Sequence, residues 1–305
     1  MVINKIKNLF KMKRLLFIIF IFSFIISSCS KQDANTSNQK DPSDQKKPDP
    51  IQDADNPNNP SIDISSYFVS IGNGEDERPL MNCTKYDDEI IKAINDSLVI
   101  TIHKAQTKRE KVIAAAKFVV SFKTVIPYAY ETAGEEYKFI CRYTRKGLFL
   151  KNVVENGYTY PAWGCDAKTP QVYIDRYKNL GATFKNGLHC SSFVGWCLYN
   201  AGVADASVLD KTWANNYRTF PLSTEKNLKD ALNLIQPGDL LWFDGHIALV
   251  IGVDGDTVLI AESAIWGSNH TDPRNGSRWR TFNKKTTNFD TFRFKSLIQM
   301  DGVYE

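Results

Sequence analysis

Histidine is scarce in this sequence, and closely spaced cysteine pairs are missing from it. The 305 residues include four histidines and six cysteines, and no two cysteines stand in a C-x-x-C pair. Structural zinc sites are built from closely spaced cysteine and histidine ligands. The sequence therefore argues against a zinc site, and it also shows no internal repeat.

The N-terminus lacks a hydrophobic run long enough to span a bilayer. The apolar stretch from Leu15 to Ile26 is 12 residues long, whereas a transmembrane helix needs about 20. Five basic residues precede the stretch, and Ile26-Ser27-Ser28-Cys29 closes it. This order is typical of a secretory signal peptide. Its last four residues resemble a bacterial lipobox, in which cleavage leaves a lipid-modified cysteine.

We therefore predict a lipoprotein signal peptide over residues 1–28, with Cys29 as the lipidated first residue of the mature chain. The protein would be exported and anchored to a bacterial membrane, facing either the periplasm or the cell surface. An ordinary signal peptide cut near the same serines, or an uncleaved anchor, is the alternative.

A surplus of positive charge is missing once this leader is set aside. Residues 1–28 hold five of the 38 basic residues and none of the 34 acidic ones, which leaves 33 basic residues against 34 acidic ones. A nearly neutral chain gives no support for nucleic-acid binding by bulk charge. We expect no nucleic-acid partner and a monomeric protein.

Large apolar residues are nearly absent from residues 29–61, which are rich in Pro, Asn, Asp, Gln and Lys. Such a segment buries too little surface to offset its ordering entropy, and we expect a disordered tether. Residues 62–305 then have the length of one large domain. Within this domain, residues 131–185 show no sustained period and are interpreted as an insertion with short elements.

Helical spacing of apolar residues begins near Asp87 and again after Thr107. Thr107 is followed three residues later by Glu110, which is the pattern of a capping box at a helix start. We expect the second helix to end before Pro127.

Asp-Gly pairs punctuate the C-terminal third of the chain. Asp244-Gly245 and Asp254-Gly255 separate apolar runs, which is a strong signal of β-hairpins. We expect a further strand near Phe292. The predicted fold class is α+β, with N-terminal helices followed by an antiparallel meander.

Cys190 lies where a glycine-containing loop becomes a segment with helical spacing, in N-G-L-H-C-S-S-F-V-G-W-C. The first turn of a helix offers unpaired N–H groups and a positive dipole end, which favour a thiolate over a thiol. Cys197 falls on the buried face and is better explained as core. Without a partner, Cys190 would also be interpreted as a packed thiol.

His246 is the candidate base for such a thiolate, because it begins a strand directly after a tight turn. In a two-residue hairpin at Asp254-Gly255, Ser263 would lie opposite His246, with Glu262 one place away. A shift or bulge of one residue would bring Glu262 to the face of His246. Glu262 is therefore the candidate for orienting the imidazole. The alternatives are Ser263, Asn269 and His270.

These stretches together resemble the NlpC/P60 cysteine peptidases of bacterial cell walls. H-C-S-S-F-V at residues 189–194 is similar to the family's D-C-S-G-F-V motif. P-G-D-L-L-W-F at residues 237–243, followed by H-I-A-L-V-I-G at residues 246–252, is similar to its second motif. The likeness covers residues 186–263, and it implies a papain-like fold in which a nucleophile helix packs on the meander.

The resemblance also implies the roles of particular residues. Cys190 would be the nucleophile and His246 the base. The family's third residue, usually a histidine, maps near Glu262, and the related CHAP amidases commonly use an acidic group there. Tyr128, in I-P-Y-A-Y-E, corresponds to a tyrosine that lies near the nucleophile in the family, where it would assist substrate or oxyanion binding.

This chain departs from the family pattern around its nucleophile. His189 stands in place of the usual aspartate, Ser192 in place of glycine, and the glycine pair after the upstream tyrosine is missing. Sixty-one residues separate Tyr128 from Cys190, more than in compact family members. His189 is also an alternative partner for the thiol.

We therefore predict a lipid-anchored cysteine hydrolase that needs no metal and no organic cofactor. Cys190 would attack a peptide carbonyl of a peptidoglycan stem peptide, and backbone N–H groups at the helix start would bind the oxyanion. The resemblance implies a bond between γ-D-glutamate and a diamino acid as the target. Two alternatives remain: an amidase or acyltransferase with the same Cys–His pair, and a catalytically inactive wall-binding lipoprotein of the same fold.

Overall fold

The computed structural model describes residues 62–72, 76–129, 146–155, 158–168, 175, 181–203, 222–266, 272 and 274–305. These residues fall within one compact unit, Pro60–Glu305. The predicted signal peptide and tether lie outside the described ranges, as do Cys29, Cys141, Asn269 and His270. In the ranges that are described, no helix has both the length and the apolar character needed to cross a membrane.

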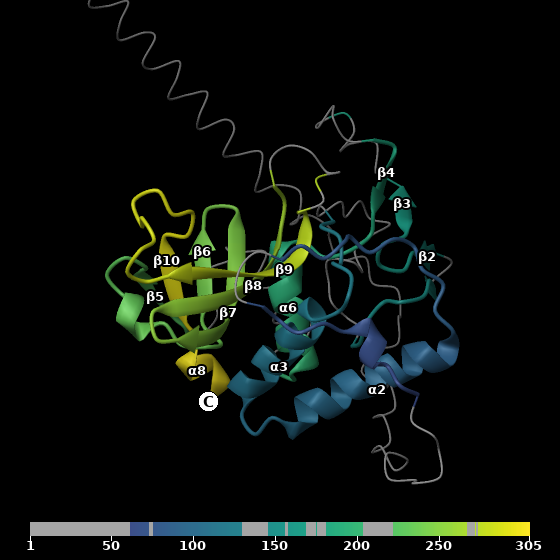
Figure 1. Cartoon of the computed structure of the whole chain (residues 1–305), viewed down its shortest axis with the longest axis horizontal. Coiled ribbons are helices and arrows are strands. Elements are labelled where there is room, and N and C mark those ends of the chain that lie inside the picture. Colours follow the sequence, from purple (N-terminus) through teal and green to yellow (C-terminus); the bar gives the residue numbers. More distant parts are fainter. Residues whose placement is uncertain are drawn as a thin grey trace, which may run out of the picture. The chain divides into compact units, whose positions relative to one another are not determined.

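A six-stranded antiparallel sheet, in the strand order β5-β10-β6-β7-β8-β9, organises the described chain (Figure 1). The α+β class and the antiparallel meander are confirmed. The strand expected near Phe292 begins later, at Ser296, and β9 was not predicted. The strands are β5 (Thr224–Asn227), β6 (Leu240–Phe243), β7 (His246–Asp254), β8 (Thr257–Ala264), β9 (Gly276–Asn283) and β10 (Ser296–Gln299).

Helices α3 and α6 pack against this sheet, and α2 packs on α3 (Figure 1). The capping box is confirmed, because the Thr107 side chain accepts a hydrogen bond from the Glu110 N–H while the Glu110 carboxylate accepts one from the Thr107 N–H. The helices are α2 (Asp88–Lys104), α3 (Lys108–Val120), α6 (Cys190–Asn200) and α8 (Asp301–Tyr304), with 3₁₀ turns at Ser65–Tyr67 and Leu232–Leu234.

Apolar side chains of the sheet alternate between two clusters, one on each face, as the period of a strand requires. The first cluster joins the sheet to α2, α3 and α6, and includes Leu240, Trp242, Ile247 and Leu249. The second lies on the opposite face and includes Leu241, Ala248, Val250 and Phe294. The sheet is therefore buried on both faces, which explains why β6 and β7 are apolar without interruption.

Two small hairpins lie apart from the main sheet (Figure 1). They pair β1 (Val153–Glu155) with β2 (Tyr158–Tyr160), and β3 (Asp166–Lys168) with β4 (Thr183–Lys185). A disulfide between Cys83 and Cys165 ties the segment before α2 to the start of β3. The sequence did not determine which cysteines form disulfides, and the structure assigns this pair.

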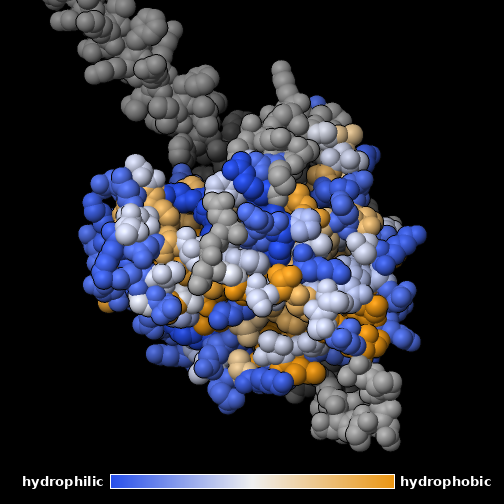
Figure 2. Space-filling view, in the orientation of Figure 1, coloured by the Kyte–Doolittle hydropathy of each residue, from blue (hydrophilic) through white to orange (hydrophobic). Residues whose placement is uncertain are grey.

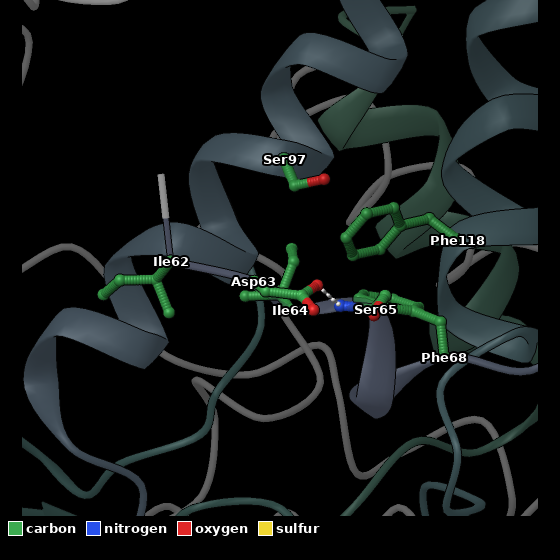
Figure 3. A pocket seen from close by; sticks show the side chains of 7 residues that line it. All are labelled: Ile62, Asp63, Ile64, Ser65, Phe68, Ser97 and Phe118. Carbon is green, nitrogen blue, oxygen red and sulfur yellow. Dashed lines mark hydrogen bonds between the residues drawn. The ribbon is translucent and has the colours of Figure 1, made fainter. Parts of the chain in front are cut away.

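Polar residues cover most of the face shown in Figure 2, and apolar residues appear there in small separate groups. A pocket of about 610 Å³ lies where residues 62–68 pass α2 and α3 (Figure 3). It is lined by Ile62, Asp63, Ile64, Ser65, Phe68, Ser97 and Phe118. None of the candidate catalytic residues predicted from the sequence lines this pocket, so the pocket is separate from the candidate active site.

Candidate active site

Cys190 is the first residue of α6, the position that the sequence predicted for it. Its side chain is buried, with 8 % of the residue exposed. The backbone N–H groups of the first helical turn have no acceptor within the helix. The sulfur therefore lies at the positive end of a helix whose residues are buried almost throughout.

His189 and Ser192 form a capping box at the start of α6, which accounts for both departures from the family motif. The His189 Nδ1 accepts from the Ser192 N–H at 3.3 Å, and the His189 N–H donates to the Ser192 Oγ at 2.6 Å. A histidine can therefore replace aspartate as the N-cap, because the residue at the third helical position completes the box. The Nδ1 of His189 is committed to the helix start.

His246 begins β7 immediately after the turn at Asp244-Gly245, as predicted, since Phe243 pairs with His246 across that turn. Its ring packs against the rings of Phe243 and Phe294, with centroid separations of 5.5 and 5.7 Å. The Cys190 Sγ lies 4.0 Å from the carbonyl oxygen of Gly245. The turn thus brings His246 to the nucleophile end of α6.

The hairpin between β7 and β8 differs from the prediction. Asp254 pairs with Thr257, so Gly255 and Asp256, not Asp254 and Gly255, are its central residues. A bulge between Val250 and Gly252 then shifts the register by one residue. The predicted register of strict pairing was therefore wrong for two reasons, a turn centred one residue later and a bulge, and neither is revealed by the local sequence pattern.

Beyond the bulge, Leu249 pairs with Ala261. His246 is three residues from Leu249, and Glu262 is one residue from Ala261. Because side chains alternate along a strand, His246 and Glu262 both point to the face of the sheet opposite to that of Leu249 and Ala261. The His246 Nε2 and the Glu262 Oε2 are 2.5 Å apart, and both side chains are buried. The Nδ1 of His246 is then the nitrogen left to face the thiol.

Ser263, the alternative neighbour of His246, points to the other face. Its hydroxyl donates to the carbonyl oxygen of Leu188 at 2.6 Å. It thereby ties β8 to the loop before the nucleophile. Asn269 and His270 lie outside the described residues.

Two arginines that the sequence analysis missed contact the carboxylate of Glu262. The Arg280 Nε lies 2.7 Å from the Glu262 Oε1, and an Arg293 Nη lies 3.9 Å from the same oxygen. Arg280 belongs to β9, whose apolar residues Trp279 and Phe282 lie in different core clusters and so show no alternation along the sequence. Burial raises the pKa of Glu262, but His246, Arg280 and Arg293 outweigh it and lower the pKa to about 2.

The charges at the site favour an ion pair between Cys190 and His246. Burial raises the pKa of the Cys190 thiol, but hydrogen bonds and charge from His189 and His246 more than offset this and lower it to about 5. Burial lowers the pKa of His246, but Glu262 and Cys190 raise it above its ordinary value. By contrast, burial raises the pKa of the Cys197 thiol. Position thus distinguishes the two free cysteines of the described chain.

Tyr128 lies in the segment that runs beside the loop before Cys190. The Leu188 N–H donates to the carbonyl oxygen of Pro127 at 3.0 Å, which pins the two segments together. A Cβ at Gly187 would lie 1.9 Å from that same oxygen, so only glycine allows the approach. Tyr128 is half-buried, and both it and Cys190 lie within electrostatic reach of Arg293. The structure therefore brings Tyr128 to the same region as the thiol.

Asp239 of the P-G-D stretch has a structural position. Its buried carboxylate accepts from the N–H groups of Gln236 at 3.0 Å and Met300 at 3.2 Å, and it pairs with Arg109 at 3.4 Å. The motif thus fastens the start of β6 to α3 and to the C-terminal segment. It contributes to the site only by holding the strands that carry His246.

The assembled groups can perform nucleophilic acyl chemistry. A cysteine with a lowered pKa lies at a helix start, an imidazole beside it, and a buried carboxylate behind the imidazole, which is the order that nucleophilic catalysis requires. Within the described ranges, no three His, Cys, Asp or Glu side chains gather in a way that could hold a metal ion.

One comparison with known proteins identifies part of this chain. The profile of the CHAP domain matches residues 179–264, a stretch that includes Cys190, His246 and Glu262. CHAP domains are found in cell-wall hydrolases, and the match suggests hydrolysis of peptidoglycan. No curated protein and no solved structure matches the chain.

Proposed function

We propose that this protein is a cysteine endopeptidase of the bacterial cell wall that cleaves peptidoglycan stem peptides. The observation that carries the proposal is the chain of contacts from Cys190 through His246 to the buried carboxylate of Glu262, inside the segment that matches the CHAP domain. The proposed framework is papain-like, with the nucleophile helix α6 packed on the strands that carry the base.

The reaction proceeds through a thioester. The Cys190 thiolate attacks the carbonyl carbon of the scissile amide, and the N–H of Cys190 at the helix start stabilises the resulting oxyanion. The His246 imidazolium then gives its proton to the leaving amine, and the C–N bond breaks. His246 next takes a proton from water, the hydroxide attacks the thioester, and the released thiolate regenerates the ion pair.

Glu262 and Tyr128 support these steps in different ways. The Glu262 carboxylate holds the His246 ring and stabilises its positive charge, as the short Nε2–Oε2 contact allows. Tyr128, held next to the nucleophile loop, contacts the substrate near the developing oxyanion. The proposed target is the bond between γ-D-glutamate and the diamino acid of the stem.

A second candidate is an amidase that cuts between the sugar and the stem peptide. The specific observation in its favour is the acidic third group, since the carboxylate of Glu262 occupies the position where the related CHAP amidases commonly carry an acid. The same acyl-enzyme chemistry serves both reactions, so the products distinguish them.

The anchor of this enzyme is part of the proposal. After cleavage of residues 1–28, a lipid on Cys29 and a tether over residues 29–61 would hold the catalytic domain, residues 62–305, within reach of the wall. Incorporation of labelled fatty acid into the expressed chain, and its loss in Cys29→Ser, tests the anchor.

Mass analysis of purified peptidoglycan fragments tests the reaction. The chain that begins at Ser30 is incubated with the fragments beside Cys190→Ala, with Cys197→Ala as the matched control for loss of a thiol outside the site. We expect a cut between the second and third stem residues, present with the control and absent with Cys190→Ala. Release of whole stem peptides from the sugar would favour the amidase. If no product forms and Cys190 is alkylated slowly, the hydrolase is rejected and the inactive wall-binding lipoprotein becomes the favoured function.

A further inference from the structure

Three arginines surround Trp266 beside the candidate active site. The guanidinium carbons of Arg280, Arg274 and Arg293 lie 4.7, 5.3 and 5.7 Å from the centre of the Trp266 ring. The main chain at Trp266 is fixed because its backbone N–H donates to the side-chain oxygen of Asn275 at 2.7 Å. Stacking of this kind orients guanidinium groups without consuming their hydrogen-bond donors.

The carboxylates near this cluster do not balance its charge. Arg274 forms a two-pronged pair with Asp272, at 3.0 and 2.7 Å. Arg280 and Arg293 have only Glu262 between them, and both approach the same oxygen. Glu262 also contacts His246 and raises its pKa, so its negative charge is shared with the imidazole. One positive charge at Arg280 and Arg293 therefore has no matching negative charge among the described residues.

These two arginines retain donors that could bind a ligand. Among the described residues, the nearest acceptor to Arg293 is the Glu262 Oε1 at 3.9 Å, which is beyond hydrogen-bond distance, and the ion pair of Arg280 with Glu262 uses its Nε and leaves its Nη atoms available. Their side chains are 23 and 26 % exposed, so solutes can reach them. Burial and the neighbouring Arg280 lower the pKa of Arg293, whereas Glu262 raises it, and an added anion would act in the same direction as Glu262.

Arg293 lies close to His246, so its unbalanced positive charge is near the proposed catalytic base. Its guanidinium packs over Phe243 at 5.0 Å and Phe294 at 5.5 Å, the two rings that also pack against His246. Cys190 and Tyr128 both lie within electrostatic reach of it. A ligand group bound by Arg293 would therefore lie on the same side of the molecule as His246 and within electrostatic reach of Cys190.

We propose that Arg280 and Arg293, stacked on Trp266, form a subsite that binds a free carboxylate of the substrate peptide adjacent to the scissile amide. The proposal rests on the proposed function and extends it to substrate selection. A carboxylate matches the planar, two-pronged geometry of guanidinium groups. In a γ-glutamyl linkage the α-carboxylate stays free beside the cleaved amide, and amidation of that carboxylate removes the charge that the subsite binds.

A pair of synthetic substrates tests the subsite. One is an alanyl-γ-D-glutamyl-diamino acid peptide with the free α-carboxylate, and the other has the corresponding carboxamide. We expect kcat/KM to be about 10- to 100-fold higher for the carboxylate form, mostly through KM, because charge-assisted hydrogen bonds are lost with the carboxamide. Equal values for the two substrates would overturn the proposal.

Variants assign the preference to the arginine. Arg293→Gln should reduce the ratio of the two kcat/KM values to near one, while Arg293→Lys, which keeps the charge, should retain part of it. Arg274→Gln is the matched control, since Arg274 stacks on the same ring but is paired with Asp272. Loss of the preference in Arg274→Gln, with the preference intact in Arg293→Gln, would contradict the assignment.

A binding measurement separates the subsite from the reaction. Calorimetry with Cys190→Ala and the dipeptides alanyl-γ-D-glutamate and alanyl-D-isoglutamine needs no cleavage. Tighter binding of the first dipeptide, with neither peptide substrate cleaved by the wild type, would retain the subsite and reject the proposed endopeptidase. Cleavage without preference, or binding without preference, would reject the subsite.

Discussion

Two opposing effects act on the thiol of Cys190. Burial alone would keep it protonated, as it does for Cys197, whose pKa is raised. The difference comes from His189 and His246, which lower the pKa of Cys190 to about 5. In the proposed mechanism, these two histidine neighbours turn a buried cysteine into a nucleophile.

Alkylation by iodoacetamide should distinguish the two free cysteines. The rate at Cys190 should rise as pH increases through about 5, where the thiolate forms, and reach a plateau well below the ordinary range of about 8.5. Cys197 should react only after unfolding, because it is fully buried. Peptide mass spectrometry after timed labelling measures both. A midpoint for Cys190 near that of a free thiol would contradict the ion pair.

Replacement of Glu262 tests the residue behind the base. In Glu262→Gln the His246 pKa should fall and the Cys190 pKa should rise, because the charge that raises the former is removed. We expect kcat/KM to drop more than about tenfold and the alkylation midpoint of Cys190 to move upward. The exposed Glu89→Gln in the first turn of α2 is the control.

The same carboxylate has a consequence for acid stability. The pKa of Glu262 is about 2 in the fold and 4.5 as the ordinary value, so its ionised form stabilises the native state above pH 4.5. This contribution is lost as pH falls through that interval toward 2. Urea unfolding between pH 2 and 5 should show a flatter pH dependence for Glu262→Gln than for the wild type. If the pH dependence of unfolding were the same in the variant and the wild type, the pKa of Glu262 would not be lowered in the folded state.

At the scale of elements, the start of α6 and the bulge in β7 shape the site. The capping box of His189 and Ser192 sets where the helix begins, and thus where Cys190 lies. The bulge between Val250 and Gly252 decides which side chain of β8 faces His246. Both features act through the backbone, by fixing where an element begins and which residues pair.

Substitutions of His189 should separate its capping role from its effect on the thiol. His189→Asn keeps a side-chain acceptor for the Ser192 N–H, so thermal stability should be nearly retained, while His189→Ala should cost about 1 kcal/mol. Both variants should raise the pKa of Cys190, since a hydrogen bond that lowers it is lost. Differential scanning calorimetry and the alkylation midpoint measure the two effects. Equal stability of the Asn and Ala variants would contradict the cap.

For the whole molecule, the segment before α2 closes the fold against β9. Arg78 pairs with Asp76 and donates to the carbonyl oxygen of Ser277 at 3.2 Å, and Arg278 donates to the carbonyl oxygen of Arg78 at 3.0 Å. These groups are buried. Side-chain hydrogen bonds thus fasten the segment at Asp76–Arg78 to β9, the edge strand of the sheet, and the disulfide at Cys83 ties the following residues to Cys165.

Removal of this disulfide should destabilise the protein without altering the thiolate. The bond closes a loop with a sequence separation of 82 residues, and the chain-entropy argument gives a loss of about 4 kcal/mol when such a loop is opened. We expect the double variant Cys83→Ser and Cys165→Ser to unfold at lower urea concentration. Its Cys190 alkylation midpoint should match the wild type, and a shifted midpoint would mean that the tie also shapes the site.

The predictable parts of the fold are those with local causes. The capping box at Thr107, the turn at Asp244-Gly245 and the helix start at Cys190 all follow from residues within a few positions of one another. The strand β9, and with it Arg280, was missed because its alternation is interrupted by charged residues whose partners lie far along the chain. The predicted register of β8 against β7 was wrong because the position of a turn and the presence of a bulge depend on packing against the rest of the fold, not on the local sequence.

Sequence alone determined that a cysteine begins a buried helix and that a histidine begins a strand after a tight turn, because caps, turns and hydrophobic periods are written in neighbouring residues. Only the tertiary structure decided that Glu262 and not Ser263 contacts His246, that His189 caps the helix, and that two arginines gather beside that carboxylate. These outcomes depend on strand register and on charges brought together from distant segments, and no spacing along the chain encodes either.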